Sequence, residues 1–275
     1  MEYLSLVGKW EAKLKDGTTY PMQVPGTLDE NQIGGKDLGA NQWHPDADLG
    51  NAENGFDPDA PIATRYTRKY TYEGEARISR MLSYIPEEEK RIFLEVERAR
   101  CLKLKIDGKE VPDYVEPSIS TPHIFEVTDL LDGEHRITLR SDNSYPGLPR
   151  DAIVFSSAAT DETQTNWNGV LGYVRLRTER EVFLSAVRVY PEKNRIHVQV
   201  TIDGSIPYKG VLRLNSPALE DVAEQEITVS AGVRTIMFND LPLRADVKKW
   251  DEEEGNLYDL TASLQDGDEK SVTFG

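Results

Sequence analysis

Several residue types are scarce in this sequence, and each shortage excludes a class of protein. The single cysteine, Cys101, allows neither an internal disulfide nor a metal site built from cysteines. The chain carries 32 basic and 48 acidic residues, which gives a formal net charge of −16. Binding to nucleic acid or to an anionic membrane needs a basic surface, so we expect neither as a partner. Long apolar runs are also missing, since no stretch approaches the ~18 residues of a membrane span.

The sequence also lacks a secretory signal at its N-terminus and the common catalytic motifs. Residues 1–6 lack the basic segment and apolar run of a secretory signal, which slightly favours the cytoplasm and otherwise leaves the localisation open. A nucleophile elbow, a P-loop, a dinucleotide fingerprint and a His-Glu-x-x-His motif are all absent. Neighbouring acidic residues, as at residues 252–254, point to opposite faces of a strand and form no acid and base pair. The sequence therefore predicts no catalytic residue and no cofactor.

An acidic loop at residues 46–59 superficially resembles a calcium-binding loop. An EF-hand needs an oxygen ligand at its fifth position and a glycine at its sixth, whereas Gly50 and Asn51 stand at these positions. We therefore favour a solvated acidic loop and predict no metal site.

Apolar residues recur with a period of two along most of the chain, which is the pattern of strands rather than helices. The alternation is clearest at residues 92–96, 102–106 and 196–202. Turn signals fall about every 8–12 residues, as in β-sandwiches. The predicted fold class is therefore all-β. Further strands are expected at residues 137–139, 170–176, 183–190, 211–214, 226–229, 235–238 and 257–264.

Two arginines interrupt the alternation between the first two of these strands. Arg98 and Arg100 occupy positions whose parity would place them in the core. Because unpaired guanidinium groups are not buried in a core, we expect a bulge or a crossing between sheets at residues 98–101.

The composition changes after about residue 180, where we place a domain boundary near residues 178–181. The predicted domains are residues 1–180 and 181–275, and the second length suits a seven-strand immunoglobulin-like sandwich. Two long polar segments, residues 26–63 and 142–169, resist assignment to strands. Long loops of this kind are often functional.

The densest group of hydrogen-bonding side chains lies at residues 160–169. It combines amides, hydroxyls and carboxylates with Trp167, and such a set can bind sugar hydroxyls and stack on a pyranose ring. The other interpretation is a loop that is held by hydrogen bonds from its own amide side chains and covers a buried Trp167. The candidate substrate-binding residues are Asp161, Glu162, Asn166, Trp167, Asn168, Asp142, Asn143, Trp43 and His123.

The tryptophans and histidines divide by context. Trp10 and Trp250 are expected in the core, whereas Trp43 lies in a polar loop and is the more plausible ligand contact. His123 begins a strand, where it has either a structural role or a place in a cleft. Two further histidines occupy polar strand positions and are expected to be solvated: His135 and His197.

A series of short strings runs in order along the chain: residues 24–31 (VPGTLDEN), 64–74 (TRYTRKYTYEG), 92–98 (IFLEVER), 120–123 (STPH), 142–144 (DNS), 163–169 (TQTNWNG), 185–191 (SAVRVYP), Trp250 and 256–261 (NLYDLT). Each string alone is weak, but their number and order are specific. Together they resemble the N-terminal part of glycoside hydrolase family 2, which includes β-galactosidases, β-glucuronidases and β-mannosidases. The resemblance covers almost the whole chain.

The resemblance implies a jelly-roll sugar-binding domain, an immunoglobulin-like domain and then a (β/α)8 barrel that carries both catalytic glutamates. The sequence ends where the family's linker strand leads into the barrel, so the expected partners are the barrel of the same enzyme and a β-glycoside carbohydrate, with a homo-oligomer as a further candidate. The loop ending at Trp167 is implied to reach the mouth of the barrel. The chain departs from the family at Thr163, where some members carry a sugar-binding aspartate, and at residues 76–80, where Ala-Trp-Tyr-Arg-Arg becomes Ala-Arg-Ile-Ser-Arg.

Two hypotheses of function follow. The first is the non-catalytic portion of a retaining family 2 glycosidase, which supports the barrel and shapes its substrate cleft. The alternative is a freestanding carbohydrate-binding module. We favour the first because binding modules usually offer several exposed aromatic rings, and few are expected here. Hydrolysis by the chain alone is not expected, since no pair of carboxyl groups can be assigned at the ~5–10 Å separation that glycosidases need.

Overall fold

The structure is a computed structural model that describes residues 2–36, 69–116, 118, 120–149, 152–153, 165–265 and 267–275. The elements with described bounds are β-strands and one 3-10 helix, η2 (Thr128–Leu130), which confirms the predicted all-β class. Within these residues no helix has the length and apolar character of a membrane span. The predictions on Trp43, Asp161 and Glu162 lie outside the described residues.

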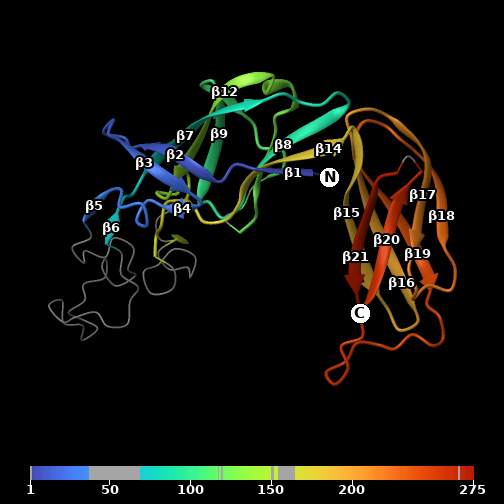
Figure 1. The fold of residues 1–275 in the computed structure, drawn as a ribbon. Helices are drawn as coiled ribbons and strands as arrows, with labels where there is room; N and C mark the ends of the chain where they lie inside the picture. Colours follow the sequence, from blue (N-terminus) through green and yellow to red (C-terminus); the bar gives the residue numbers. More distant parts are fainter. Residues whose placement is uncertain are drawn as a thin grey trace, which may run out of the picture. The chain divides into compact units, whose positions relative to one another are not determined.

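The chain divides into two compact units, Met1–Thr178 and Glu179–Gly275 (Figure 1). The larger sheet of the first unit has the strand order β10-β9-β12-β7-β2-β3 and the smaller one β1-β14-β8-β11. The larger sheet comprises β2 (Gly8–Lys13), β3 (Thr19–Val24), β7 (Glu75–Tyr84), β9 (Cys101–Ile106), β10 (Lys109–Val111) and β12 (Gly133–Asp142). The smaller sheet comprises β1 (Glu2–Ser5), β8 (Lys90–Val96), β11 (His123–Glu126) and β14 (Val174–Arg180). Two short ladders pair β4 (Gly26–Thr27) with β13 (Gly169–Val170) and β5 (Gly35–Lys36) with β6 (Tyr70–Thr71).

One apolar core lies between the two sheets of the first unit. Alternate side chains of the central strands β9 and β12 are buried, among them Leu104 and Leu139, which face each other across the ladder. The smaller sheet contributes Leu94 from β8 and Leu176 from β14 to the same core. The period of two in the sequence thus reflects one face of each sheet turned inward.

Strand β8 departs from the simple alternation because both of its faces are buried. On the outer face Glu95 is only 5% exposed, and its carboxylate accepts hydrogen bonds from Arg175 Nε at 2.8 Å and Arg177 Nε at 2.6 Å. The guanidinium of Arg177 also lies 4.4 Å from the ring centre of Phe93. Two guanidinium groups therefore compensate the buried carboxylate and cover the apolar ring beside it.

The predicted crossing between sheets at residues 98–101 is confirmed. Strand β8 belongs to the smaller sheet and β9 to the larger one, so the chain changes sheets between them. Arg98 has a φ of +53°, and its exposed side chain bonds Glu97 at 2.9 Å. Arg100 is buried but has partners, as described below. The chain thus places one guanidinium in solvent and the other in a polar contact rather than in the apolar core.

The single strand predicted at residues 170–176 is wrong. The segment forms β13 and β14, which belong to different sheets, with a break at residues 171–173. The break is bonded to the crossing segment, since Leu171 N donates to Arg98 O and Gly172 N donates to Glu97 O. A Cβ at Gly172 would stand 2.7 Å from the backbone oxygen of Glu97, so only glycine fits this approach of the two segments.

The second unit consists of two antiparallel sheets around a core of its own. One sheet has the order β15-β16-β19, with β15 (Val182–Pro191), β16 (Arg195–Gly204) and β19 (Gly232–Pro242). The other has the order β18-β17-β20-β21, with β17 (Tyr208–Asn215), β18 (Ala223–Val229), β20 (Tyr258–Leu264) and β21 (Glu269–Phe274). Strand β16 buries every second residue from Ile196 to Ile202, as its alternation predicts. Strand β21 was not expected, because its polar composition hides the period.

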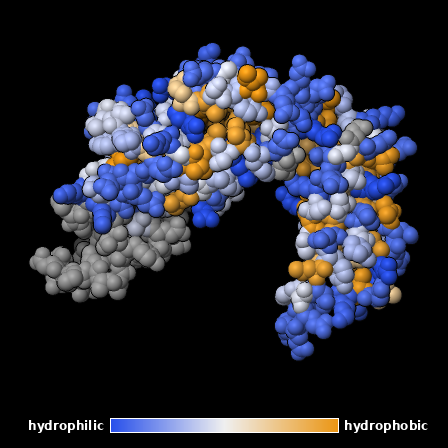
Figure 2. All heavy atoms as spheres, viewed as in Figure 1, coloured by the Kyte–Doolittle hydropathy of each residue, from blue (hydrophilic) through white to orange (hydrophobic). Residues whose placement is uncertain are grey.

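Hydrophilic side chains cover most of the face seen in Figure 2, and hydrophobic side chains interrupt them in small groups. This surface is consistent with the formal charge of −16, because charged side chains are kept in water.

Candidate functional site

The string at residues 24–31 has a structural role in the first unit. Thr27 N donates to Glu30 Oε2 at 2.8 Å, and Glu30 N donates to Thr27 Oγ1 at 3.0 Å, which closes a reciprocal turn. Asp29 Oδ1 accepts hydrogen bonds from the backbone N–H groups of Lys69 and Tyr70 at 3.1 and 2.8 Å. The carboxylate of Glu30 therefore closes the turn, and that of Asp29 ties the turn to the start of β6.

Three predicted binding residues, Asn143, Asn166 and Asn168, form a buried group that we call the amide cluster. Asn143 Nδ2 donates to Tyr72 O and to Asn166 O, both at 2.9 Å, while Asn143 Oδ1 accepts from Gly74 N at 2.9 Å. Asn166 Nδ2 donates to Asn143 O at 3.0 Å, and Asn168 Nδ2 donates to Gly74 O at 2.8 Å. The cluster satisfies backbone groups of the loops that meet here, so its amides hold the fold together rather than face a ligand.

The glycine that follows the amide cluster is required by its backbone. Gly169 has a φ of +118°, and a Cβ there would lie 2.6 Å from Gly26 O on the paired strand β4. Asn168 Oδ1 accepts from Gly169 N at 2.8 Å, which joins this turn to the cluster. The Trp-Asn-Gly string is therefore explained by a close approach of two backbones.

Trp167 stands between two residues of the amide cluster in the sequence, and its ring contacts Arg100. The guanidinium of Arg100 stands 4.1 Å from the ring centre of Trp167, and Arg100 Nη2 donates to Thr165 O at 3.2 Å. Arg100 is only 4% exposed, and burial lowers the pKa of its guanidinium. One face of the indole is thus covered by a cation, which supports a packing role for the half-buried Trp167.

A cavity of about 430 Å³ adjoins this region, and we call it the His123 cavity. Its walls come from β7, β9, β11 and β12 and from the segments after β10 and β12. It brings together two residues that the sequence proposed separately, His123 and Asp142. The described residues of its lining are Glu75, Arg100, Cys101, Leu102, Lys103, Asp113, Ser118, His123, Arg140, Asp142, Pro146 and Leu148.

His123 is 3% exposed and begins β11. Its Nε2 lies 3.1 Å from Arg100 O, and because a carbonyl only accepts, Nε2 carries the proton. Burial lowers the pKa of His123, which favours the neutral imidazole with a lone pair on Nδ1. Nδ1 is buried without a hydrogen-bond partner, and the facing Asp113 Oδ1 stands 4.0 Å away. Burial also raises the pKa of the Asp113 carboxyl.

Among the described residues that line the His123 cavity, three carry acidic and three carry basic side chains. Arg140 Nε donates to Glu75 Oε2 at 2.9 Å, and this pairing lowers the pKa of Glu75. Lys103 Nζ lies 3.3 Å from Glu110 Oε1. Since Arg100 stacks on an indole, each of the three cations already has a partner.

Asp142 closes a turn at the end of β12 with one of its two oxygens. Ser144 N and Ser144 Oγ donate to Asp142 Oδ1 at 2.8 and 2.6 Å. Both described bonds end on Oδ1, so Oδ2 retains its capacity to accept. Among the lining residues, Asp113, Arg140 and Glu75 were not predicted, because no local motif connects these three separate segments.

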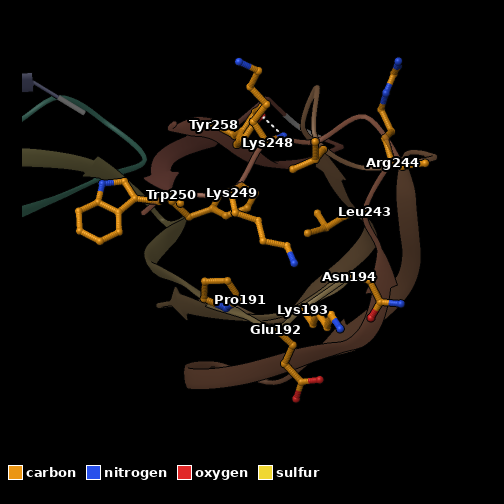
Figure 3. Close-up of a pocket in the computed structure, with 14 residues that line it drawn as sticks. Pro191, Glu192, Lys193, Asn194, Leu243, Arg244, Lys248, Lys249, Trp250 and Tyr258 are labelled. Carbon is orange, nitrogen blue, oxygen red and sulfur yellow. Dashed lines mark hydrogen bonds between the residues drawn. The ribbon is translucent and has the colours of Figure 1, made fainter. Parts of the chain in front are cut away.

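A second depression, of about 560 Å³, lies in the second unit, and its strands and loops are seen in Figure 3. Lys249 points into the ring of lining residues, whereas the indole of Trp250 points away from it. Lys248 N donates to Tyr258 Oη at 2.9 Å. The prediction that Trp250 lies in the core is wrong, because its side chain is 59% exposed; its segment precedes β20 without pairing into a sheet. Trp10 is buried as predicted, at 3% exposure.

The two histidines that were expected to be solvated, His135 and His197, are partly exposed and lie beside carboxylates. His135 is half-buried, and its Nδ1 and Nε2 lie 2.7 Å from Asp107 Oδ2 and 2.9 Å from Asp132 Oδ1. These carboxylates raise the pKa of His135. His197 is half-buried as well, with Glu192 Oε1 3.3 Å from its Nε2. In the part of the chain that the structure describes, no group of three or more histidine, cysteine, aspartate or glutamate side chains is arranged to hold a metal ion.

The chain was compared with protein-family models, curated protein sequences and solved structures. No protein-family model and no curated protein sequence matches the chain. Among solved structures, a GH2 β-galacturonidase from Eisenbergiella tayi bound to galacturonate matches 100% of this chain with 17% identity and a TM-score of 0.64. A β-D-mannosidase from Dictyoglomus thermophilum matches 100% with 18% identity and a TM-score of 0.63. A β-glucuronidase from Bacteroides uniformis matches 99% with 16% identity and a TM-score of 0.64.

The resemblance to glycoside hydrolase family 2 is thereby confirmed at the level of the fold. This chain spans 43%, 36% and 32% of those three longer chains, respectively. At these identities the likeness concerns the fold, so catalytic activity and substrate are matters for proposal.

Proposed function

We propose that this chain is the β-sandwich portion of a family 2 glycosidase, in which a catalytic barrel outside this sequence carries the two catalytic carboxylates. In this proposal residues 1–180 are a jelly-roll sugar-binding domain and residues 181–275 an immunoglobulin-like domain. The observation that carries the proposal is the match of the whole chain to less than half of each GH2 enzyme. The ordered strings in the sequence support it independently.

The proposed role of this portion is to support the barrel and to shape its substrate cleft. The loop that ends at Trp167 is the segment proposed to reach the mouth of the barrel. The amide cluster supports this assignment, because it braces the end of the loop with buried hydrogen bonds. A braced loop end can hold a substrate contact in place, and Asp161, Glu162 and Trp43 remain the candidates for that contact.

The decisive experiment has two parts. The parent gene is sequenced past Gly275, and both the 275-residue chain and the longer product are tested on nitrophenyl glycosides. We expect a downstream (β/α)8 pattern and hydrolysis by the longer product alone. A stop codon directly after Gly275, or chromophore release by the 275-residue chain, contradicts the proposal.

The alternative is a freestanding carbohydrate-binding module, and the His123 cavity is the observation that favours it. Its apolar rim and buried acceptors suit a small hydroxylated ligand. Binding of a sugar by the 275-residue chain together with a parent gene that encodes no barrel would establish this alternative over the first proposal.

A further inference from the structure

We propose that the surface around Trp250 in the second unit is the docking site for the polypeptide that follows Gly275. The proposal rests on the proposed function, in which a catalytic barrel continues the chain, and it names the residues that hold the start of that barrel. Three observations carry it: an exposed apolar pair, the position of Gly275 beside this pair, and two lysines without partners in the adjoining depression.

Trp250 and Leu257 form the exposed apolar pair. The indole is 59% exposed and the leucine side chain 60% exposed. Figure 3 shows that the indole points away from the other residues that line the depression. Tryptophan is highly buried in most folded proteins, and aromatic rings are enriched where proteins bind one another. An exposed apolar pair of this kind therefore indicates an interaction surface.

The loop that carries Trp250 is held by its own hydrogen bonds. Asp251 Oδ1 accepts two backbone N–H groups of the acidic run that follows it, at 3.0 and 2.7 Å. Asn256 Nδ2 donates to Lys249 O at 3.0 Å, which ties the two ends of the loop together. A loop that is already ordered loses little conformational entropy when a partner binds. The backbone therefore presents the indole to a partner without rearrangement.

The position of Gly275 indicates which partner covers the pair. A Cβ built on Gly275 would stand 3.0 Å from Trp250 Cβ and 3.0 Å from Leu257 Cδ2, so Gly275 lies against both residues. A segment joined to Gly275 therefore begins next to the indole, and the covalent link keeps its effective concentration in about the millimolar range. Because a separate partner lacks this advantage, the polypeptide that follows Gly275 is the expected occupant.

The charges of the depression predict the character of that polypeptide. Its described lining includes four basic side chains and one acidic side chain. Two of the basic side chains form ion pairs with carboxylates outside the lining. The other two, Lys193 and Lys249, have no ion-pair partner among the described residues, and Lys249 points into the ring of lining residues (Figure 3). We therefore expect apolar side chains against Trp250 and a carboxylate opposite the two lysines.

The test compares the 275-residue chain with the longer product of the parent gene by hydroxyl-radical footprinting and mass spectrometry. We expect Trp250 and Leu257 to be oxidised at least about tenfold more slowly in the longer product, because docking buries both side chains. Met237 is the internal control, since it is 43% exposed on β19 and lies outside the depression. It should be oxidised at the same rate in both chains.

Two variants of the longer product test the apolar and the charged parts of the docking separately. Trp250→Ala should lower the protection of Leu257 about tenfold, as expected for a central aromatic contact, and the exposed position keeps the second unit folded. Lys249→Glu should lower the same protection by about twofold to fivefold. Lys209→Glu is the matched control, because Lys209 is exposed and lies outside the depression. It should leave the protection unchanged.

The possible outcomes separate this inference from the proposed function. If Trp250 is oxidised equally fast in both chains while the longer product hydrolyses glycosides, the inference is overturned and the proposed function stands. Protection of Trp250 in a longer product that hydrolyses no glycoside supports the docking and contradicts the proposed function. A stop codon directly after Gly275 overturns both. Unchanged protection in Trp250→Ala, or equal protection in Lys249→Glu and Lys209→Glu, contradicts the contacts assigned here.

Discussion

The amide cluster and the His123 cavity are neighbouring polar regions of the first unit with opposite character. In the cluster Asn143 donates and accepts within the protein, and its partners in these bonds are three backbone groups from two segments. In the cavity His123 presents a buried lone pair that no described residue meets. Both regions are rich in side chains that can bind sugars. The comparison teaches that residue type alone does not tell whether a polar side chain finds its hydrogen-bond partners within the fold.

The largest effect is expected from Asn143→Ala, which tests whether the amide cluster is structural. The change leaves Tyr72 O, Asn166 O and Gly74 N without their described partner, so the free energy of unfolding should fall by about 3–5 kcal/mol. Urea unfolding measures this loss. The control Ser144→Ala, at an exposed neighbour, should cost less than about 1 kcal/mol. A loss of similar size in both variants would contradict the distinction.

An intermediate effect is expected at the border of the two regions. Arg100→Met removes the contact with Trp167 and the bond to Thr165 O, and we expect a loss of about 1–2 kcal/mol with a change in tryptophan fluorescence. Arg98→Met is the matched control, because Arg98 is exposed and makes a surface ion pair with Glu97. It should change stability by no more than about 0.5 kcal/mol. Equal losses would show that burial of Arg100 contributes nothing.

A smaller effect separates two histidines, His123 and His135, through the pH dependence of stability. The folded pKa of His123 is lowered by burial, so its neutral form stabilises the fold at higher pH and the wild type loses stability relative to His123→Phe as pH falls below about 6.5. The folded pKa of His135 is raised by Asp107 and Asp132, so its contribution is full below about 6.5 and is lost as pH rises through the folded pKa. Urea unfolding of the wild type, His123→Phe and His135→Gln is measured between about pH 5 and 8. The difference in unfolding free energy between the wild type and each variant, plotted against pH, should have slopes of opposite sign for the two variants. Slopes of the same sign would show that His123 is charged in the fold.

The smallest effect is expected in the second unit, at Trp250→Ala. Because the indole is 59% exposed, the free energy of unfolding should change by about 0.5 kcal/mol or less. Trp10→Ala, by contrast, opens a hole in the core of the first unit and should cost about 3–5 kcal/mol. Urea unfolding of the two variants, each followed in its own unit, measures both changes. A large loss at Trp250 would indicate that the loop before β20 contributes to the core of the second unit.

Much of the fold was predictable because alternate residues of a strand face the core and are apolar. The inward faces of β9, β12 and β16 follow that rule, and the misplaced arginines predicted the change of sheets at residues 98–101. The break at Gly172 was not predictable, because it depends on a contact with Glu97 that is distant in sequence. The exposure of Trp250 was missed for a related reason, since burial statistics for tryptophan do not record whether its segment joins a sheet.

The candidate site was predictable in its residue types and less so in its arrangement. His123 and Asp142 were both proposed, yet only the structure shows them in one cavity with Asp113 and Arg140. The amides of Asn166 and Asn168 were proposed for the same purpose, and the structure turns them to the backbone. Hydrogen-bonding capacity is a property of the residue, but its partner is a property of the fold.

The sequence by itself determined the class of this protein: alternation set an all-β chain, and the ordered strings indicated the fold of family 2 glycosidases. Only the tertiary structure decided which polar side chains have hydrogen-bond partners within the protein and which do not. The physical reason is that alternation is a local property of the backbone, whereas the saturation of Asn143 and the isolation of His123 Nδ1 depend on segments that meet after folding.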